Sequence, residues 1–240
     1  MIDLRVIYNN MIIGNGAIAK SFIDFNHHDL CVFASGVSNS KEENKECYDR
    51  EFDLLEKTIR ENSDKKLIYF STSSVETKPV SSYIKHKIRL ERYIEFNTKD
   101  FLILRLPNIV SGSENKHQLI GYFYDCLVNN KPIKIVSHYE RNLIDVCDIP
   151  KIVDLLLKIP IKKITVGFLN QLTIKEIVLI LEEITNKSFI DIEEIGGVSE
   201  KKLNNELFLK LIDENDFNVD PFQIIKKYYS NEDISSSVHI

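Results

Sequence analysis

The segment Ile13-Gly-Asn-Gly-Ala-Ile-Ala19 places two glycines and a small residue between an apolar run and a helical pattern. The run is Asn10–Ile13, and the helix is expected to extend to about Phe25. In a G-x-G-x-x-A turn the first glycine turns tightly, the second lets a ligand approach the backbone, and the alanine lets helix and strand pack closely. The helix N–H groups then face an anion. The segment predicts a strand, turn and helix suited to a pyrophosphate, with residues 1–10 either an extension or part of a longer strand.

The next apolar strand, Leu30–Phe33, ends in the small residues Ala34, Ser35 and Gly36. A dinucleotide-binding fold normally ends its second strand, about 20 residues after the turn, in a residue that contacts the adenosine ribose. This strand has no carboxylate there. The adenosine end of such a site is therefore expected to be abnormal.

Hydroxyl and amine groups gather in the next part of the chain. The apolar strand Leu67–Phe70 runs into Ser71-Thr-Ser-Ser74, and Tyr83 and Lys87 follow on one face of a helix because they are four residues apart. An ammonium there favours the phenolate, so Tyr83 could exchange protons near neutral pH. Taken alone, this pair is equally explained by an exposed helix face. Glu91 is at ion-pairing spacing from Lys87, and His86 is expected to point away from this face.

Composition excludes several classes of protein. With 240 residues, of which 43% are hydrophobic and 28% charged, the chain can build a full core as one domain, or as one domain and a small lobe. A net charge of -5 with scattered lysines gives no basic footprint for nucleic acid. No run of 18 apolar residues and no signal pattern occur, which predicts a cytoplasmic protein without membrane contact. The four cysteines and six histidines show no metal pattern, so free thiols and no metal site are expected.

The order of these features resembles the extended branch of the short-chain dehydrogenase/reductase superfamily, the NAD-dependent epimerases, dehydratases and reductases of nucleotide sugars. The glycine turn, the hydroxyl-rich strand end and the Tyr-x-x-x-Lys helix carry the resemblance. Phe101–Asn108 with Gly112 is similar to the Leu-Arg-x-x-Asn-x-x-Gly segment of that family, and Glu140–Asp148 to its Arg-x-x-x-x-Val-x-Asp segment. The resemblance covers about residues 10–225.

The resemblance implies a Rossmann-like, doubly wound parallel α/β sheet with a small C-terminal α+β substrate lobe. Leu30–Gly36 resembles the fourth strand of the family more than its second, so two strands of the adenosine half are expected to be missing. We expect residues 1–160 to form the dinucleotide-binding domain and 161–240 the lobe, with part of 109–148 on the substrate side. A homodimer through helices near 42–62 and 81–96 is the family expectation.

The resemblance also implies roles for individual residues. Tyr83 would be the acid/base, Lys87 would activate it and hold the nicotinamide ribose, and Thr72 would polarise the sugar C–O group. Ser73, Asn108 and Arg141 would bind substrate. The cofactor, NAD or NADP, would contact Gly14, Asn15, Gly16, Ala17, Ile18, Ala34, Ser35, Gly36, Lys87 and Pro107.

Some of these positions have structural explanations as well. Pro107 and Gly112 are equally ordinary loop residues, and Arg141 could form a surface salt bridge. Asp145 and Asp148 are expected to cap the helix that starts near Ile149. Thr173 with Glu176 forms a capping box in sequence, which explains that match on structural grounds alone.

The predicted activity is hydride transfer between NAD or NADP and a nucleotide-linked sugar, by a reductase or an epimerase. Ser73 and Ser74 stand where 4,6-dehydratases of the family carry an Asp-Glu pair, which argues against a dehydratase. The alternative is a protein of the same fold that binds the sugar nucleotide or dinucleotide without turnover. The missing strands and the eleven-residue step from Thr72 to Tyr83 motivate that alternative.

Overall fold

The computed structural model describes residues 11–27, 29–77, 80–112, 116–196, 202–213 and 216–230. Its main element is a parallel five-stranded sheet in the order β1-β2-β3-β4-β8. The strands are β1 Met11–Ile13, β2 Leu30–Phe33, β3 Lys66–Thr72, β4 Phe101–Leu106 and β8 Lys163–Thr165.

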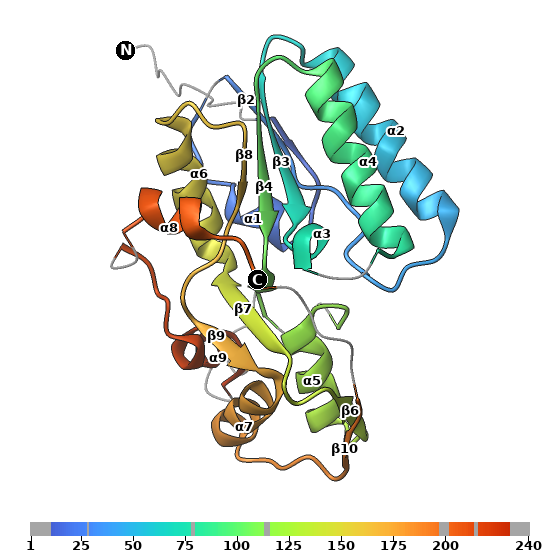
Figure 1. Ribbon diagram of the computed structural model, residues 1–240, viewed down its shortest axis with the longest axis vertical. Helices are drawn as coiled ribbons and strands as arrows, with labels where there is room; N and C mark the ends of the chain where they lie inside the picture. The colour runs from blue at the N-terminus through green and yellow to red at the C-terminus, as the bar shows by residue number, and fades with distance from the viewer. Residues whose placement is uncertain are drawn as a thin grey trace, which may run out of the picture.

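Helices cover both faces of this sheet (Figure 1). Helices α1, Ala17–Ser21, and α6, Ile149–Leu157, lie on one face, and α2, Lys45–Glu61, and α4, Ser82–Asn97, lie side by side on the other. Alternate residues of β3 divide between the faces, with Ile68 in the core under α1 and α6 and Tyr69 in the core under α2 and α4. Burial on both faces explains why the strands read as continuous apolar runs.

The sheet order accounts for the abnormal second strand. β2 pairs directly with β1, from Met11 opposite Cys31 to Ile13 opposite Phe33. A doubly wound sheet normally continues beyond its first strand in both directions. In the described part of the chain, β1 is instead the edge of the sheet. The predicted Rossmann-like sheet that lacks two strands of the adenosine half is confirmed.

A smaller lobe lies at the carboxyl end of this sheet (Figure 1). It holds a three-stranded sheet, β5-β7-β9, formed by Asn108–Val110, Glu140–Asp145 and Gln171–Thr173, and a pair, β6-β10, formed by Ile133–Ile135 and Ile192–Glu194. Its core joins helices α5, Leu119–Val128, α7, Ile174–Thr185, and α9, Pro221–Tyr229. The short helices are α3 Ser74–Thr77, the 3-10 turn η1 Val146–Asp148, and α8 Glu206–Leu211.

The main sheet and the lobe interleave along the chain. β8 and α8, both beyond residue 160, lie with the main sheet, and Phe208 of α8 belongs to its core. The strands β5, β6 and β7 precede residue 160 and lie in the lobe.

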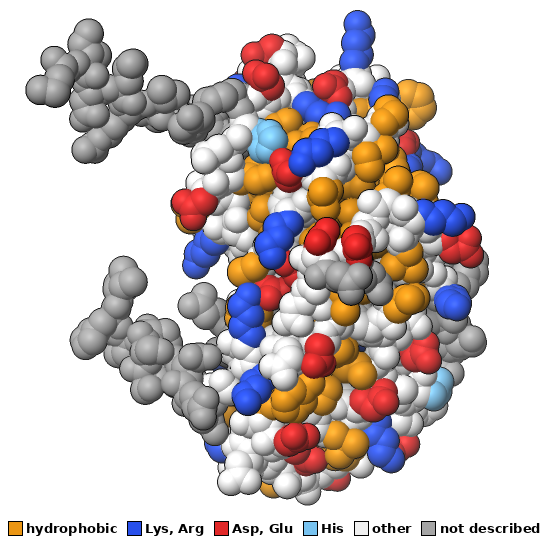
Figure 2. Space-filling model, turned by 90° about the vertical axis from the view of Figure 1, so that its left-hand side faces the viewer, with side chains coloured by type: hydrophobic (Ala, Val, Ile, Leu, Met, Phe, Trp, Pro, Cys, Tyr) orange, Lys and Arg blue, Asp and Glu red, His pale blue; other side chains and the backbone are white. Residues whose placement is uncertain are grey.

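Acidic and basic side chains are interspersed with apolar ones over the surface on the α6 and α8 side (Figure 2).

Several local expectations are settled by the structure. The capping box of Thr173 and Glu176 at the start of α7 is confirmed. Helix α1 ends at Ser21, before the expected Phe25, and the apolar run 101–108 divides into β4 and β5 at Pro107, which has no N–H to donate. Residues 1–10 and the tail from 231 lie outside the described residues. No described helix has the length and apolarity that a membrane crossing requires.

Candidate active site

The two glycines of the turn after β1 meet different surroundings. Gly14 has φ of 128°, and a Cβ there would lie 2.5 Å from the carbonyl oxygen of Ala34, so the turn packs against the end of β2. Gly16 is the N-cap of α1, and a Cβ there would meet nothing within 4 Å. The turn therefore needs glycine at position 14 and is open at position 16, where a ligand could approach the backbone.

The remaining residues predicted for the cofactor are distributed around this turn. Ala34 follows β2 directly, and its N–H donates to the carbonyl of Ile13 at 2.8 Å. Ser35 is half-buried and Gly36 is exposed. Asn15 is exposed at the tip of the turn, whereas Ala17 and Ile18 are half-buried and pack on the core under α1. The structure thus brings the glycine turn together with the small residues after β2.

The hydroxyl groups lie at the carboxyl end of β3. Thr72 is the last residue of that strand and pairs with Leu106 of β4, next to Pro107. The hydroxyl of Thr72 accepts from the N–H of Ser74 at 3.2 Å, and the N–H of Ser73 donates to the carbonyl of Leu106 at 2.9 Å. Thr72, Ser73 and Pro107 therefore lie together at the carboxyl ends of β3 and β4.

Tyr83 and Lys87 lie in the first turns of α4. Ser81 caps the N-terminus of this helix, where its hydroxyl accepts from the N–H of Ile84. The Nζ of Lys87 is 5.8 Å from the centre of the Tyr83 ring, as expected for residues four apart on one helix face. Tyr83 is half-buried, whereas Lys87 is only 4% exposed. The predicted pairing of Lys87 with Glu91 is wrong, because Glu91 pairs with Arg105 of β4.

The partner of Lys87 is Glu51, a buried carboxylate on α2 that the sequence analysis missed. Glu51 Oε1 accepts from Lys87 Nζ at 2.7 Å, and Oε2 accepts from the N–H of Val37 at 2.9 Å and lies 3.1 Å from His86 Nε2. Burial raises the pKa of Glu51, but Lys87, His86 and Val37 lower it by more, to about 2. Because this carboxylate is ionised, Nε2 of His86 carries the proton that it donates.

Lys87 also donates to the hydroxyl of Tyr69 at 3.3 Å, from the face of β3 that α2 and α4 cover. Burial lowers the pKa of Lys87, but Tyr69 and Glu51 raise it by more, and the net pKa lies above its ordinary value. Burial raises the pKa of Tyr69, with Lys87 opposing. The ammonium is therefore charged and the Tyr69 hydroxyl neutral. The expectation that His86 points away from this group is wrong, since His86 and Lys87 both reach Glu51.

The predicted substrate residues lie on the sheet of the lobe. Asn108 begins β5, and its side-chain amide donates to the carbonyl of Asn142 at 3.2 Å. Arg141 is half-buried on β7, donates to the carbonyl of Glu140 at 2.8 Å, and lies 5.1 Å from the centre of the Tyr139 ring. Asn108 thus lies in β5, which pairs with β7, and Arg141 lies in β7 itself. Their roles toward a substrate stay predictions.

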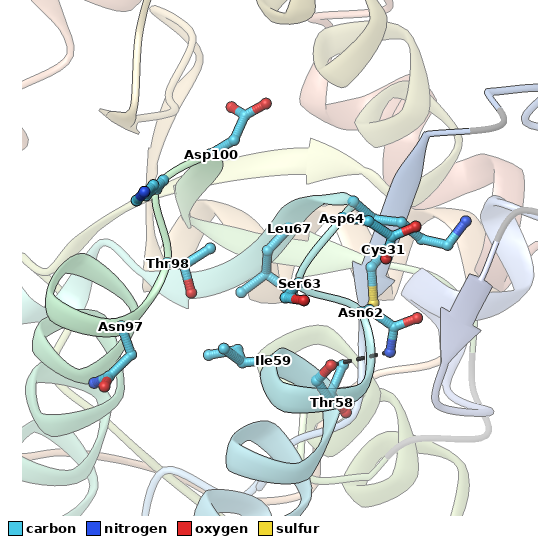
Figure 3. Close-up of a pocket in the computed structure, with 12 residues that line it drawn as sticks. Cys31, Thr58, Ile59, Asn62, Ser63, Asp64, Leu67, Asn97, Thr98 and Asp100 are labelled. Carbon is cyan, nitrogen blue, oxygen red and sulfur yellow. Dashed lines mark hydrogen bonds between the residues drawn. The ribbon is translucent and has the colours of Figure 1, made fainter.

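A cavity of about 350 Å³ lies at the amino ends of the strands of the main sheet (Figure 3). Its lining includes Cys31 and Leu67 near the amino ends of β2 and β3, with Asn62 and Thr98 from the ends of α2 and α4. Burial raises the pKa of the Cys31 thiol to about 11, with Lys65 opposing. Ligands of open parallel sheets bind at the carboxyl ends of the strands, where Gly14 and Thr72 lie. This cavity is therefore separate from the candidate active site.

Comparison with known proteins gives structural matches only. No protein-family model matches the sequence, and no curated protein matches it. The fold is similar to UDP-glucose 4-epimerase of Thermus thermophilus in complex with NAD, with a TM-score of 0.66 and 15% identity over 92% of this chain and 82% of that one. It is also similar to dTDP-glucose 4,6-dehydratase of Bacillus anthracis in complex with NAD, with a TM-score of 0.64 and 19% identity over 90% and 76% of the two chains.

A third structure, MoeE5 in complex with UDP-glucuronic acid and NAD, has a TM-score of 0.66 and 13% identity over 88% of this chain and 80% of that one. At these identities the likeness concerns the fold. Because a 4,6-dehydratase is among the similar structures, the comparisons do not support the predicted exclusion of that reaction. The predicted resemblance is confirmed as a shared fold: this chain folds like NAD-bound epimerases and dehydratases of nucleotide sugars, in a shortened form.

Proposed function

We propose that this protein converts a nucleotide-linked sugar by hydride transfer with NAD or NADP, as a reductase or an epimerase. The observation that carries the proposal is the proximity of Tyr83 to a buried, charged Lys87, which packs against Gly36 after β2 in a fold similar to NAD-bound sugar-nucleotide enzymes. In this arrangement Tyr83 would act as acid and base in turn.

The chain fits the cofactor at its pyrophosphate and ribose. Gly14 leaves no room for a Cβ, and Gly16 is open where the pyrophosphate would approach, with Asn15, Ala17 and Ile18 around it. Ala34, Ser35 and Pro107 would flank the nicotinamide half, and Lys87 would hold its ribose. When bound, the cofactor would supply the acceptor or donor of the hydride that leaves or returns to a sugar carbon.

The residues of the chain would move the accompanying proton. Tyr83 would take the proton of the sugar hydroxyl as the C–H bond breaks, or return one to the oxygen of a keto-sugar. The Thr72 hydroxyl would share that oxygen. Ser73 and Asn108 would contact the sugar nucleotide, and the planar guanidinium of Arg141 suits a diphosphate.

Two features support reduction or epimerisation over elimination of water. Ser73 and Ser74 supply hydroxyls where elimination needs a carboxylate to remove a proton. Glu76 is the next carboxylate along the chain, and its Oε1 accepts from Arg105 at 2.5 Å and from Thr165 at 2.9 Å. Because β1 is the edge strand among the described residues, the adenosine half would be held weakly, which favours an exchangeable cofactor and hence a reductase.

The test is turnover of nucleotide-linked hexoses and their keto forms by Tyr83→Phe. Loss of a general acid/base lowers turnover by about 10²–10⁴-fold, with substrate affinity nearly unchanged. Tyr93→Phe, on the same helix but half-buried against Phe52 and bonded to Glu56 at 3.0 Å, is the matched control and should retain parental activity. Equal turnover in Tyr83→Phe would contradict the assigned role.

A second candidate, a protein that binds without turnover, is favoured by one observation. The ammonium of Lys87 already has Glu51 as an ionic partner, which reduces its field at Tyr83. Saturable binding of cofactor and sugar nucleotide without any reaction would support this candidate. A cytoplasmic location and a homodimer through α2 and α4 are further proposals that rest on the resemblance.

A further inference from the structure

The carboxylate of Glu51 connects three segments of the proposed site. It binds Lys87 and His86 of α4 through different oxygens, and it also binds the backbone of Val37 in the segment after β2. Glu51 lies on α2, 36 residues before Lys87 in the chain. One side chain thus fixes the distance between the catalytic helix and the segment predicted to contact the cofactor.

We propose that Glu51 is a positioning residue, which holds the ammonium of Lys87 where a cofactor ribose and Tyr83 can both use it. The proposal deepens the proposed function and rests on it. Glu51 touches neither substrate nor cofactor in this account. It acts through Lys87.

The geometry around Nζ leaves it little freedom. A lysine ammonium has three donors, and the contacts above use two of them, toward Glu51 on α2 and Tyr69 on β3. Nζ also lies 5.5 Å from the Tyr69 ring centre and 5.8 Å from that of Tyr83. Two anchors from different elements and two flanking rings define one position for the charge, with one donor remaining for a ligand hydroxyl.

Gly36 closes this arrangement from the side of the cofactor segment. A Cβ on Gly36 would lie 2.9 Å from Oε1 of Glu51 and 3.1 Å from Nζ of Lys87. The exposed backbone of Gly36 therefore packs directly on the buried ion pair. This close approach explains a glycine at a position predicted to line the cofactor.

The negative charge of Glu51 is essential in this arrangement. A buried ammonium without an anionic partner tends to lose its proton, because burial disfavours the charged form. The groups that face Lys87 are Glu51 from α2, Tyr69 from β3, and Tyr83 from its own helix. His86 faces Glu51 and stacks on Tyr48 at 4.6 Å. Glu51 is the only carboxylate among these groups of the described chain.

The experiment compares Glu51→Gln with the parent and with Glu61→Gln, an exposed position at the end of the same helix. Two quantities are followed between pH 6 and 10: the Kd of NADH from its fluorescence, and the titration of Lys87 by ¹⁵N NMR without cofactor. Loss of one charged hydrogen bond predicts NADH binding weaker by about tenfold or more. In Glu51→Gln, Lys87 should also lose its proton at a lower pH, so binding weakens further as the pH rises.

The outcomes separate this inference from the proposed function. A parent that binds neither NADH nor NADPH overturns the proposed function, and the proposal falls with it as a statement about cofactor binding. An unchanged Lys87 titration and unchanged Kd in Glu51→Gln overturn the positioning role while the proposed function stands. Glu61→Gln should keep the parental Kd of NADH and the parental Lys87 titration, and the same changes in Glu61→Gln as in Glu51→Gln would overturn a specific role of Glu51.

A second variant keeps the proposal testable if Glu51→Gln does not fold. Gly36→Ala adds a methyl group against the same ion pair from the cofactor segment, and should shift the Lys87 titration and weaken NADH binding in the same directions. Gly196→Ala, where a Cβ meets nothing within 4 Å, is the matched control. A Gly36→Ala protein with the parental Kd and titration would overturn the proposal.

Discussion

Arg105 on β4 and Glu91 on α4 form a two-point ion pair, with Nη2 2.6 Å from Oε2 and Nε 3.0 Å from Oε1. Ser71 donates to the same carboxylate at 2.6 Å, and the other arm of the guanidinium reaches Glu76 of α3. Arg105 therefore ties helix α4 and the turn after Thr72 to the sheet. Local spacing predicted a different partner for Glu91, namely Lys87.

Replacement of this arginine should destabilise the fold. In Arg105→Met the carboxylate of Glu91, only 2% exposed, loses its two-point partner and keeps only the more distant Lys163 at 3.7 Å, and breaking a buried pair costs about 3–5 kcal/mol. Urea denaturation measures the free energy of unfolding. Arg92→Met, at an exposed position of α4, should change it by less than about 0.5 kcal/mol. A similar small change in Arg105→Met would contradict the assigned role of this ion pair.

The two glycines of the turn should respond differently to alanine. Gly14→Ala forces a Cβ to 2.5 Å from a carbonyl oxygen at φ of 128°, and strain of this kind costs about 1–3 kcal/mol. Gly16→Ala meets open space and should leave thermal stability near that of the parent. Thermal unfolding of both variants tests the turn geometry. Equal stabilities would show that β2 does not pack against Gly14 as described.

The Glu51 ion pair predicts a specific loss of stability in acid. The folded-state pKa of Glu51 is about 2, below the ordinary value of 4.5, mainly because Lys87 and His86 oppose the effect of burial. Its contribution is therefore fully present above about pH 4.5 and is lost as the pH falls toward 2. Denaturation between pH 6 and 3 should show a steeper loss for the parent than for Glu51→Gln. Parallel curves would contradict the lowered pKa.

Helix α9 should depend on a buried carboxylate of β7. Asp145 accepts from Lys227 at 2.7 Å and from Tyr228 at 2.6 Å, and also caps η1 through the N–H of Cys147. Asp145→Ala removes the acceptor of the half-exposed Lys227 and of Tyr228, and should cost about 1–3 kcal/mol of unfolding free energy. Hydrogen exchange in 221–229 should rise in step. Unchanged protection of α9 would contradict this anchoring.

The local features could be predicted from the sequence because each depends on residues close together in the chain. The glycine turn, the helix face shared by Tyr83 and Lys87, and the capping box of Thr173 all follow from short spacings. The resemblance of Leu30–Gly36 to the fourth strand of the family also implied that two strands are missing, and the direct pairing of β2 with β1 agrees with it.

The environment of Lys87 could not be predicted in the same way, because it depends on how α2 packs against α4. Glu51 falls three residues after Tyr48 and four before Leu55, on the buried face of an amphipathic helix. A carboxylate in an apolar stripe is the signal in the sequence that could have pointed to a buried ion pair. Spacing alone could not identify Lys87 and His86 as its partners. The sequence predicts that Asp145 and Asp148 cap the helix near Ile149, but Asp145 caps the preceding turn η1, and Asp148 is the N-cap residue of α6 without a side-chain cap hydrogen bond. The contacts of Asp145 to α9, over 80 residues later, depend on the fold of the lobe.

The central claim is that this chain holds a nicotinamide dinucleotide at the turn after β1. The direct measurement is equilibrium binding of NADH and NADPH, followed by nicotinamide fluorescence, to the parent, Gly16→Glu and Gly196→Glu. Both glycines leave open space for a side chain, so only the charge beside the pyrophosphate differs. We predict saturable binding to the parent and Gly196→Glu, weakened at least about tenfold in Gly16→Glu. No saturable binding to the parent, or equal binding to all three proteins, would contradict the account.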